Sequence, residues 1–425
     1  MPGRTKCQQQ ITMVAFALQG IFFFIGYCFF DVNTVIPVFI EAFTGKVELA
    51  GVASTIRQFS TLSVQILLGS YIVKVKNVPR YLSTCLLIGY SMPLFVALAL
   101  GFELGSSALL VVVFSGVAIM WICDGLMVIG YYDMLGRTVS AKNRGRVLGY
   151  QQLIGGLGAM FAAIWIKKIL DRTNIGLTQR YILIFTIGGC ILILGAAAMF
   201  FTKDVEDRKP AKSYSLLAEL RKIPICFKTN RSLRKVMICQ ICFTSAMMVS
   251  PYILLLCKNQ FQMPEQTVST MLNFQVLGTL VGGAISAFFA PKFGNKFIVT
   301  VYCGLGMFCG LSGLLAIYGI GNMSLNAFVM VVTSGIATAS WAGFYNVMID
   351  ISDASNTHVY MLINSIITLP LSAVGLIAGQ IVKYAGYVAL LVVSLMFAIG
   401  ALISSIYLLK EKDTDGKKKS CRSRD

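Results

Sequence analysis

The sequence has few acidic residues and a single histidine. Only 18 of its 425 residues are aspartate or glutamate, and His358 is the single histidine. A membrane-bound enzyme needs clustered acids or metal ligands, and the nearest approach to such a cluster is Asp350 with Asp353 in D-I-S-D. This scarcity argues against an integral-membrane enzyme such as a lipid-modifying transferase, which is kept only as the weakest alternative function.

Two motifs are also missing or isolated. No loop of the form G-x-x-x-x-G-K-[ST] occurs, so nothing indicates that nucleotide hydrolysis supplies energy. The one C-x-x-C, Cys239 to Cys242, lies in an apolar segment far from His358. We therefore expect no metal site and no cofactor. The N-terminus lacks an apolar segment followed by a small-residue cleavage site, so the first apolar segment is expected to be retained as a helix.

Long apolar runs dominate what is present. Hydrophobic residues make up 56% of the chain and charged residues 13%, and the apolar residues fall into blocks as long as a helix that crosses a bilayer. An all-α polytopic membrane protein is predicted, embedded in the lipid bilayer. The twelve predicted spans are residues 12–40, 48–73, 79–101, 107–135, 145–169, 180–202, 234–257, 266–290, 297–320, 324–349, 358–382 and 386–409.

The basic residues are distributed unevenly between the two sides of these spans. Of the 36 lysines and arginines, 28 lie on the side that carries both termini and seven on the other side. Positive charge accumulates on the cytoplasmic side of membrane proteins, so the net charge of +18 indicates a cell-membrane protein with both termini in the cytoplasm, and no nucleic-acid partner. The exception is one opposite loop, which either anchors helix ends or attracts an anionic substrate. Its basic residues are Lys167, Lys168, Arg172 and Arg180.

The chain contains an internal repeat. S-G-V-A-I-M-W from Ser115 to Trp121 resembles S-G-I-A-T-A-S-W from Ser334 to Trp341, and Pro37 matches Pro251 at nearly the same offset. Such repeats are typical of transporters. We therefore predict two pseudo-symmetric six-helix bundles. The predicted boundaries are an N-terminal bundle at 1–202, a cytoplasmic central loop at 203–233, a C-terminal bundle at 234–409 and a basic tail at 410–425.

With these features the sequence resembles the major facilitator superfamily over essentially its whole length. P-K-F-G-N-K from Pro291 to Lys296 is similar to part of the family's loop signature, and Gly69 with Lys74 matches it more weakly. The resemblance implies a monomeric secondary transporter with a small-molecule substrate. The Gly-Pro element of drug antiporters and the paired aspartates of melibiose-type symporters are absent, so no subfamily is identified.

The resemblance also implies a cytoplasmic gate. The stretch D-M-L-G-R-T-V-S-A-K-N-R-G-R-V-L-G is similar to the acidic residue and R-G-R-x-x-G pattern found between the fourth and fifth helices of the family. Ion pairs there would close the inner side. The predicted gate residues are Asp133, Arg144, Arg146 and Lys292.

Three charged residues lie inside predicted membrane spans. A charge at mid-bilayer costs roughly 2.5 to 3.5 kcal/mol on insertion scales, so such residues face the protein interior or water and are functional candidates. Asp31 and Arg57 are each 13 residues from the turn near Thr44, which predicts that they lie at one depth and form an ion pair. The pair is either structural or opens as substrate or a proton binds, with Tyr27 on the same face as Asp31.

Asp124 has no basic partner on its own span. Burial would then favour its neutral form and make it a proton carrier; the alternatives are pairing with Arg57 or a hydrated position in an inner cavity.

The second half carries amides and aromatic groups in place of charge. Each amide either ties helices together or hydrogen-bonds substrate, beside an aromatic wall. Together with Tyr27 of the first half, the substrate-binding candidates are Gln240, Asn273, Gln275, Trp341, Tyr345, Asn346 and Asn364.

The predicted function is secondary active transport of a small solute by alternating access, driven by protons or another cation. Asp31, Arg57 and Asp124 would couple the gradient to transport. The main competing hypothesis is a transporter-like receptor or assembly factor, which would show no flux.

Overall fold

The computed structural model describes residues 6–72, 75, 77–102, 104–139, 141–203, 216–351 and 357–409, and these are overwhelmingly helical. The first half contains α1 (Lys6–Cys28), α2 (Val35–Thr44), η1 (Val47–Leu49), α3 (Val52–Ile72), α4 (Val78–Tyr90), α5 (Met92–Leu100), α6 (Ser106–Thr138), α7 (Ala141–Leu170), α8 (Leu177–Ala198) and η2 (Met199–Phe201). The remainder contains α9 (Leu216–Thr229), α10 (Arg231–Ala246), η3 (Met247–Tyr252), α11 (Ile253–Asn259), α12 (Glu265–Phe293), α13 (Asn295–Ile317), α14 (Met323–Thr338), α15 (Ser340–Ile351), α16 (Thr357–Thr368), η4 (Pro370–Ala373) and α17 (Val374–Leu409).

These helices account for twelve membrane passages. Ten segments of the described chain are long and apolar enough to cross a membrane. One of them, Leu362–Leu408, has 47 residues, or about 70 Å of helix, which is more than twice the thickness of the bilayer core. Gly386, at φ 79° and ψ 178°, divides it into two passages. The 21-residue α3 adds another passage, which is more polar than the rest because it carries Arg57 with several amides and hydroxyls.

The first and seventh passages are broken at corresponding places. The first stops at Cys28 and resumes at Val35, with Pro37 in the first turn of the new helix α2. The seventh passes from α10 into the 3₁₀ segment η3, which contains Pro251, and then into α11. Proline lacks the N–H that would continue the helical ladder, so both breaks follow from the prolines that the repeat places there.

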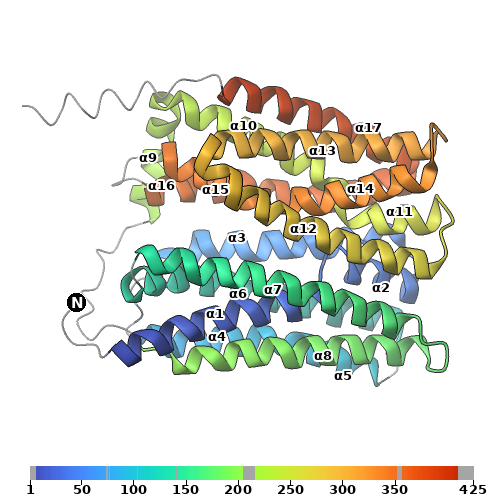
Figure 1. The fold of residues 1–425 in the computed structure, drawn as a ribbon, viewed down its shortest axis with the longest axis horizontal. Coiled ribbons are helices and arrows are strands. Elements are labelled where there is room, and N and C mark those ends of the chain that lie inside the picture. Colours follow the sequence, from blue (N-terminus) through green and yellow to red (C-terminus); the bar gives the residue numbers. More distant parts are fainter. Residues whose placement is uncertain are drawn as a thin grey trace, which may run out of the picture.

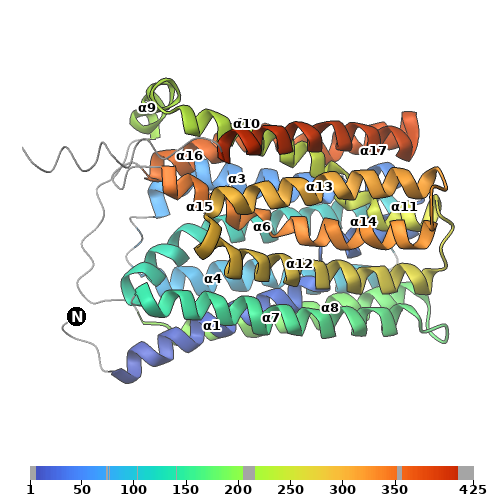
Figure 2. The same ribbon diagram turned by 45° about the horizontal axis from the view of Figure 1, so that its top comes forward.

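The helices form two bundles that lie one above the other in Figure 1, with their axes along the horizontal direction. In the first, α1 packs against α7 and α8, and α3 and α4 pack against α6. In the second, α10 and α13 pack against α17, and α12 and α13 pack against α14. In the turned view of Figure 2 the two bundles overlap, with α10 and α17 at the top and α1, α7 and α8 at the bottom. Across the division α12 packs along α7, and α3 contacts α16 and α17.

Candidate functional site

Asp31 lies in the break between α1 and α2 and stabilises the turn that precedes α2. Its Oδ1 accepts hydrogen bonds from the backbone N–H of Asn33 at 2.7 Å and from the hydroxyl of Thr34 at 3.1 Å. An aspartate that accepts from the N–H two residues further on forms an Asx-turn. This turn orders the backbone ahead of Thr34, the N-cap residue of α2.

Arg57 extends from α3 toward aromatic side chains of the first bundle. Its Nη1 donates to the Tyr27 hydroxyl at 3.4 Å, and its guanidinium carbon lies 4.3 Å from the centre of the Trp121 ring. Such cation–π contacts contribute about 0.5 to 2 kcal/mol, increasing with desolvation. The half-buried Arg57 is therefore held mainly by aromatic groups.

The expected direct ion pair between Asp31 and Arg57 is wrong. Among the described residues no nitrogen of Arg57 lies within 4.0 Å of a carboxylate oxygen. The physical reason is that Asp31 already accepts two local hydrogen bonds, while Trp121 draws the guanidinium toward α6. Tyr27 stands between the two charges, since its hydroxyl accepts from Arg57 and interacts with the carboxylate of Asp31.

Asp124 lies on α6, three residues after Trp121, and is half-buried. Residues three apart share a helix face, so the aspartate and the indole point to the same side. Arg57 attracts Asp124 electrostatically without forming an ion pair within 4.0 Å. Of the three predicted arrangements, the structure places Asp124 near Arg57 but not in contact with it.

Aromatic side chains surround this group. Tyr27 stacks on Phe23 at 5.6 Å between ring centres, and Phe23 stacks on Tyr90 at 5.8 Å. The Tyr90 hydroxyl accepts a hydrogen bond from the amide of Gln19 at 3.0 Å, and both side chains are buried. Trp121, Tyr90 and Gln19 were missing from the predicted site. The spacing of Trp121 from Asp124 was a usable signal, whereas nothing in the sequence links Gln19 to Tyr90.

The amide candidates of the second bundle differ in burial. Gln275 is 3% exposed and Asn364 is 4% exposed, and the side-chain oxygens of both, like that of the half-buried Gln240, are buried without a hydrogen-bond partner in the described chain. Asn273 is half-buried and has another interaction partner. The aromatic and amide candidates on α15 are more open, with Trp341 52% exposed and edge-on to Tyr345 at 6.4 Å. Asn346 is exposed.

The predicted cytoplasmic gate can be examined at one residue. Lys292 is exposed in the last turn of α12, where a cation is favoured by the helix dipole. The side chains of Asp133, Arg144 and Arg146 lie outside the residues that the structure describes, so the gate stays a prediction.

The two bundles touch closely at the end of the molecule that carries α2, η1 and α11, which we call the far end (right in Figure 1). The Tyr252 hydroxyl accepts from the N–H of Gly51 at 3.0 Å and lies 3.3 Å from the carbonyl oxygens of Glu48 and Gly375. A side chain on Gly51 would collide with the backbone of Gly375. Glycine is required at this crossing because the two backbones approach one another directly.

Two ion pairs cross the far end as well. Lys258 of α11 contacts Glu41 of α2 at 2.8 Å, and Lys383 of α17 contacts Glu48 of η1 at 3.6 Å. The Lys258 and Glu41 side chains are only 27% and 17% exposed. These contacts hold the two bundles together at the far end.

Two residues of the basic cluster in the predicted non-cytoplasmic loop, Lys167 and Arg180, form hydrogen bonds at or near helix ends. Lys167 donates to Thr270 of α12 at 2.7 Å, and Arg180 donates to the carbonyls of Leu170 and Ile175. The carbonyl of Leu170 belongs to the last turn of α7, so it has no N–H donor in its own helix. Of the two interpretations of this cluster, these contacts favour anchoring.

The whole chain matches a known transporter family. The family model described as Major Facilitator Superfamily matches residues 12–375. The chain belongs to the major facilitator superfamily. No curated protein matches the sequence, but solved structures of this superfamily's fold do.

Solved transporters show the same architecture at low sequence identity. A D-xylose–proton symporter superposes with a TM-score of 0.68 at 13% identity, covering 95% of this chain and 98% of that one. The E. coli fucose:proton symporter gives 0.62 at 14% identity, with 94% and 99% covered. A bacterial homologue of the iron transporter ferroportin in its inward-facing state gives 0.64 at 12% identity, with 96% and 100% covered.

Membership of the major facilitator superfamily confirms several predictions. The protein is a multi-pass membrane protein with twelve membrane helices in two pseudo-symmetric six-helix bundles. It is a transporter and not an enzyme.

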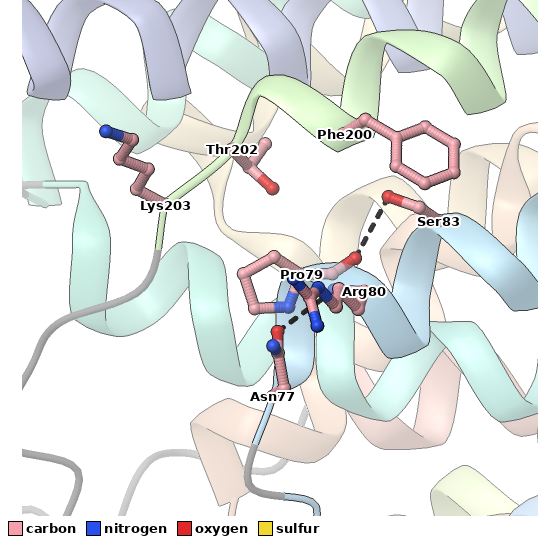
Figure 3. Close-up of a pocket in the computed structure, with 7 residues that line it drawn as sticks. All are labelled: Asn77, Pro79, Arg80, Ser83, Phe200, Thr202 and Lys203. Carbon is pink, nitrogen blue, oxygen red and sulfur yellow. Dashed lines mark hydrogen bonds between the residues drawn. The ribbon is translucent and has the colours of Figure 1, made fainter.

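One described pocket lies away from the contact between the two bundles. It has a volume of about 490 Å³ and lies beside the start of α4 and the end of η2, as Figure 3 shows. Its backbone is fixed locally, because Asn77 accepts from the N–H of Arg80 and Ser83 donates to the carbonyl of Pro79. All its residues come from the first bundle, whereas alternating access needs a site that both bundles share. We do not place the substrate there.

Proposed function

We propose that the protein is a proton-coupled secondary transporter that moves a small solute across the cell membrane by alternating access. The observation that supports this most directly is the arrangement of Arg57, Asp31 and Asp124, which concentrates charge inside one bundle beside an aromatic cluster. Intramembrane charges of this kind are costly and mark ion or proton pathways. The sugar–proton symporters among the similar structures support the same reaction class.

In this proposal Asp124 carries the proton and Arg57 senses its charge. When Asp124 is ionised it attracts the guanidinium; when it is protonated the attraction is lost and Arg57 is free to bind another group. Asp31 holds the break in the first passage through its bonds to Asn33 and Thr34. The partnerless amide oxygens of Gln240, Gln275 and Asn364 are assigned to solute recognition from the second bundle, with Trp341 and Tyr345 as an aromatic wall.

The orientation follows from the basic residues. With both termini in the cytoplasm, the far end faces outward, and its crossing contacts describe a state closed to the outside. Asp133, Arg144, Arg146 and Lys292 are the proposed gate at the opposite end. The proposed domain boundaries remain 1–202, 203–233, 234–409 and 410–425.

Reconstitution in liposomes tests the coupling. Purified protein is placed in vesicles that contain a pH-sensitive dye, and a panel of sugars and sugar acids is added outside, beginning with D-xylose and fucose. We expect at least one solute to acidify the lumen. Asp124→Asn should abolish the acidification, whereas the matched change Asp171→Asn, outside the membrane helices and exposed, should leave it intact.

The same assay separates transport from the receptor hypothesis. A receptor or assembly factor would bind a solute in a thermal-shift assay, because a ligand that binds only the folded state raises its stability. It would move neither the solute nor protons in vesicles. Binding without any flux would therefore contradict the proposed function.

A further inference from the structure

Two hydrogen-bond donors lie side by side in the first bundle without an acceptor. Of the five N–H donors of Arg57, only one has a partner in the described chain, the Tyr27 hydroxyl at a long 3.4 Å. The Trp121 ring lies against the guanidinium, and its indole N–H is buried with no partner among the described residues. The Trp121 side chain is only 5% exposed, so water does not readily satisfy this donor.

Neither nearby carboxylate contacts the guanidinium of Arg57. Asp31 accepts from Asn33 and Thr34 and forms no ion pair with Arg57. Asp124 attracts Arg57 only from beyond 4.0 Å. A half-buried cation without a contacting anion, next to an unsatisfied N–H, is costly, and the contacts of Arg57 with Tyr27 and Trp121 offset only part of this cost.

We infer that Arg57 and Trp121 form an anion subsite, and that the transported solute carries a carboxylate that binds there. This inference rests on the proposed transport function and names its substrate class. A carboxylate supplies the missing acceptors because its two oxygens match the planar fork of a guanidinium. Tyr27 and Trp121 fix the fork in place before the solute arrives.

The local charges favour a monovalent carboxylate over a phosphate dianion. Arg57 is the one cation in contact with this aromatic cluster, while Asp31 and Asp124 contribute two negative charges when ionised. A dianion would add two more negative charges against a single positive one. A carboxylate adds one, and that charge is balanced when Asp124 takes up a proton.

The repulsion between two negative charges couples binding of the carboxylate to protonation of Asp124. The carboxylate repels an ionised Asp124, so the acid binds best when Asp124 is protonated, and one proton enters with each anion. The other described titratable groups that interact with Asp31 or Asp124 are neutral tyrosines and cysteines. They are Tyr27 and Cys28 on α1, Tyr90 on α4, and Cys123 and Tyr132 on α6.

Tryptophan fluorescence tests the subsite directly. The chain has three tryptophans, so the double substitution Trp165→Phe, Trp341→Phe leaves Trp121 as the sole reporter. D-glucuronate is compared with D-glucose, which has a hydroxymethyl group in place of the carboxylate, and acetate is compared with acetamide. We expect the acids, and not their neutral counterparts, to change the Trp121 emission in a saturable way.

The pH dependence of the affinity and substitutions of Asp124 and Arg57 provide further tests. Coupled binding of one proton predicts an affinity for D-glucuronate that falls by about tenfold per pH unit once Asp124 is ionised. Asp124→Asn should bind with little dependence on pH. Arg57→Gln should lower the affinity for D-glucuronate by about 30-fold or more. This is the loss expected when one partner of a buried charged pair is removed. The comparison of acids with neutral solutes needs no substitution of Arg57, so it decides the question if Arg57→Gln does not fold.

The outcomes separate this inference from the proposed function. Equal responses to acids and neutral solutes, no response to either acid, or an unchanged acid affinity in Arg57→Gln would each overturn the anion subsite. Proton-coupled flux of an uncharged solute that survives Arg57→Gln would leave transport standing and remove the subsite. Acid binding at Trp121 without flux in vesicles would retain the subsite and contradict transport.

Discussion

At the residue scale, the charges inside the membrane are stabilised by different means. Asp31 is bonded to a backbone N–H and a hydroxyl, Arg57 is stacked on an indole, and Asp124 has only a longer-range attraction to Arg57. Within the described part of the chain Asp124 has no hydrogen bond or ion pair that holds it in its ionised form, so it is the acid best suited to take up and release a proton. This is why we assign the proton to Asp124 and a structural task to Asp31.

The structural task of Asp31 predicts a clear difference between two substitutions. Asp31→Ala removes the acceptor for Asn33 and Thr34 and should destabilise the protein by about 1 to 2 kcal/mol, the loss expected for these hydrogen bonds. Asp31→Asn keeps an acceptor oxygen, so its melting temperature should lie close to that of the unchanged protein. Thermal unfolding in detergent measures both. If Asp31→Asn melts as low as Asp31→Ala, the charge matters and the interpretation as an Asx-turn fails.

The buried pair of Gln19 and Tyr90 gives a second prediction at this scale. Tyr90→Phe leaves the Gln19 amide without its acceptor, and an unsatisfied buried polar group costs about 1 to 3 kcal/mol. The melting temperature should fall. Tyr318→Phe is the matched control, because Tyr318 is 66% exposed and should tolerate the same loss of a hydroxyl. Equal melting of the two variants would show that the hydrogen bond contributes nothing.

At the scale of elements, the two bundles share a broken first helix but stabilise the break differently. In the first bundle Asp31 stabilises the turn before α2, whereas in the second bundle the chain runs through the 3₁₀ segment η3 around Pro251, with Ser245 at the position matching Asp31. Both breaks bring a short helix, α2 or α11, to the far end. There α2, η1 and the start of α3 meet η3, α11 and α17.

The glycines at this meeting of elements set how closely the bundles approach. Gly375→Val should prevent the contact with Gly51 and shift the population toward states open at the far end. Fluorophores at Thr44→Cys and Asn259→Cys, in a chain with reactive cysteines removed, would report a longer mean distance. Gly176→Ala is the control, because an added Cβ there meets no atom within 4 Å. An unchanged distance in Gly375→Val would show that the contact does not hold the bundles closed.

At the scale of the whole molecule, the contacts between the bundles decide which side is closed. The Lys258–Glu41 and Lys383–Glu48 pairs join elements more than 200 residues apart in the chain. Because each pair belongs to both bundles, it exists only when the far end is closed. Such pairs bias the equilibrium between two states without contributing to the fold of either bundle.

A charge exchange measures this bias. Glu41→Lys places two cations together and should open the far end, whereas Glu41→Lys combined with Lys258→Glu should restore closure. The coupling energy should be about 0.5 to 1 kcal/mol, since the pair is partly exposed, and it should shrink at high salt. The distance between fluorophores at Thr44→Cys and Asn259→Cys reports the populations of the states that are open and closed at the far end. Failure of the double exchange to restore the distance would mean that the ion pair is incidental.

The sequence predicted those features of the site that are visible within one short segment, and it did not predict those that depend on contacts between helices. Asp31, Arg57 and Asp124 were recognisable because a charge in a run of apolar residues is visible without knowing the fold. Their partners were not, because counting along two helices gives depth but not the rotation of each helix about its axis. Asp31 and Arg57 both reach Tyr27, as the equal depth suggests, but Arg57 turns toward Trp121 on a helix that the count did not include.

The sequence by itself determined that this is a twelve-helix membrane transporter with an internal repeat. Apolar length, the side bias of the basic residues and the paired prolines are each properties of short segments, and the bilayer constrains such segments strongly. Only the structure decided that Trp121 holds Arg57, that Asp31 stabilises the turn before α2, and that Gly51 meets Gly375. The reason is physical: each of these contacts joins groups that several residues with similar chemistry could have supplied, and the packing of whole helices selects one.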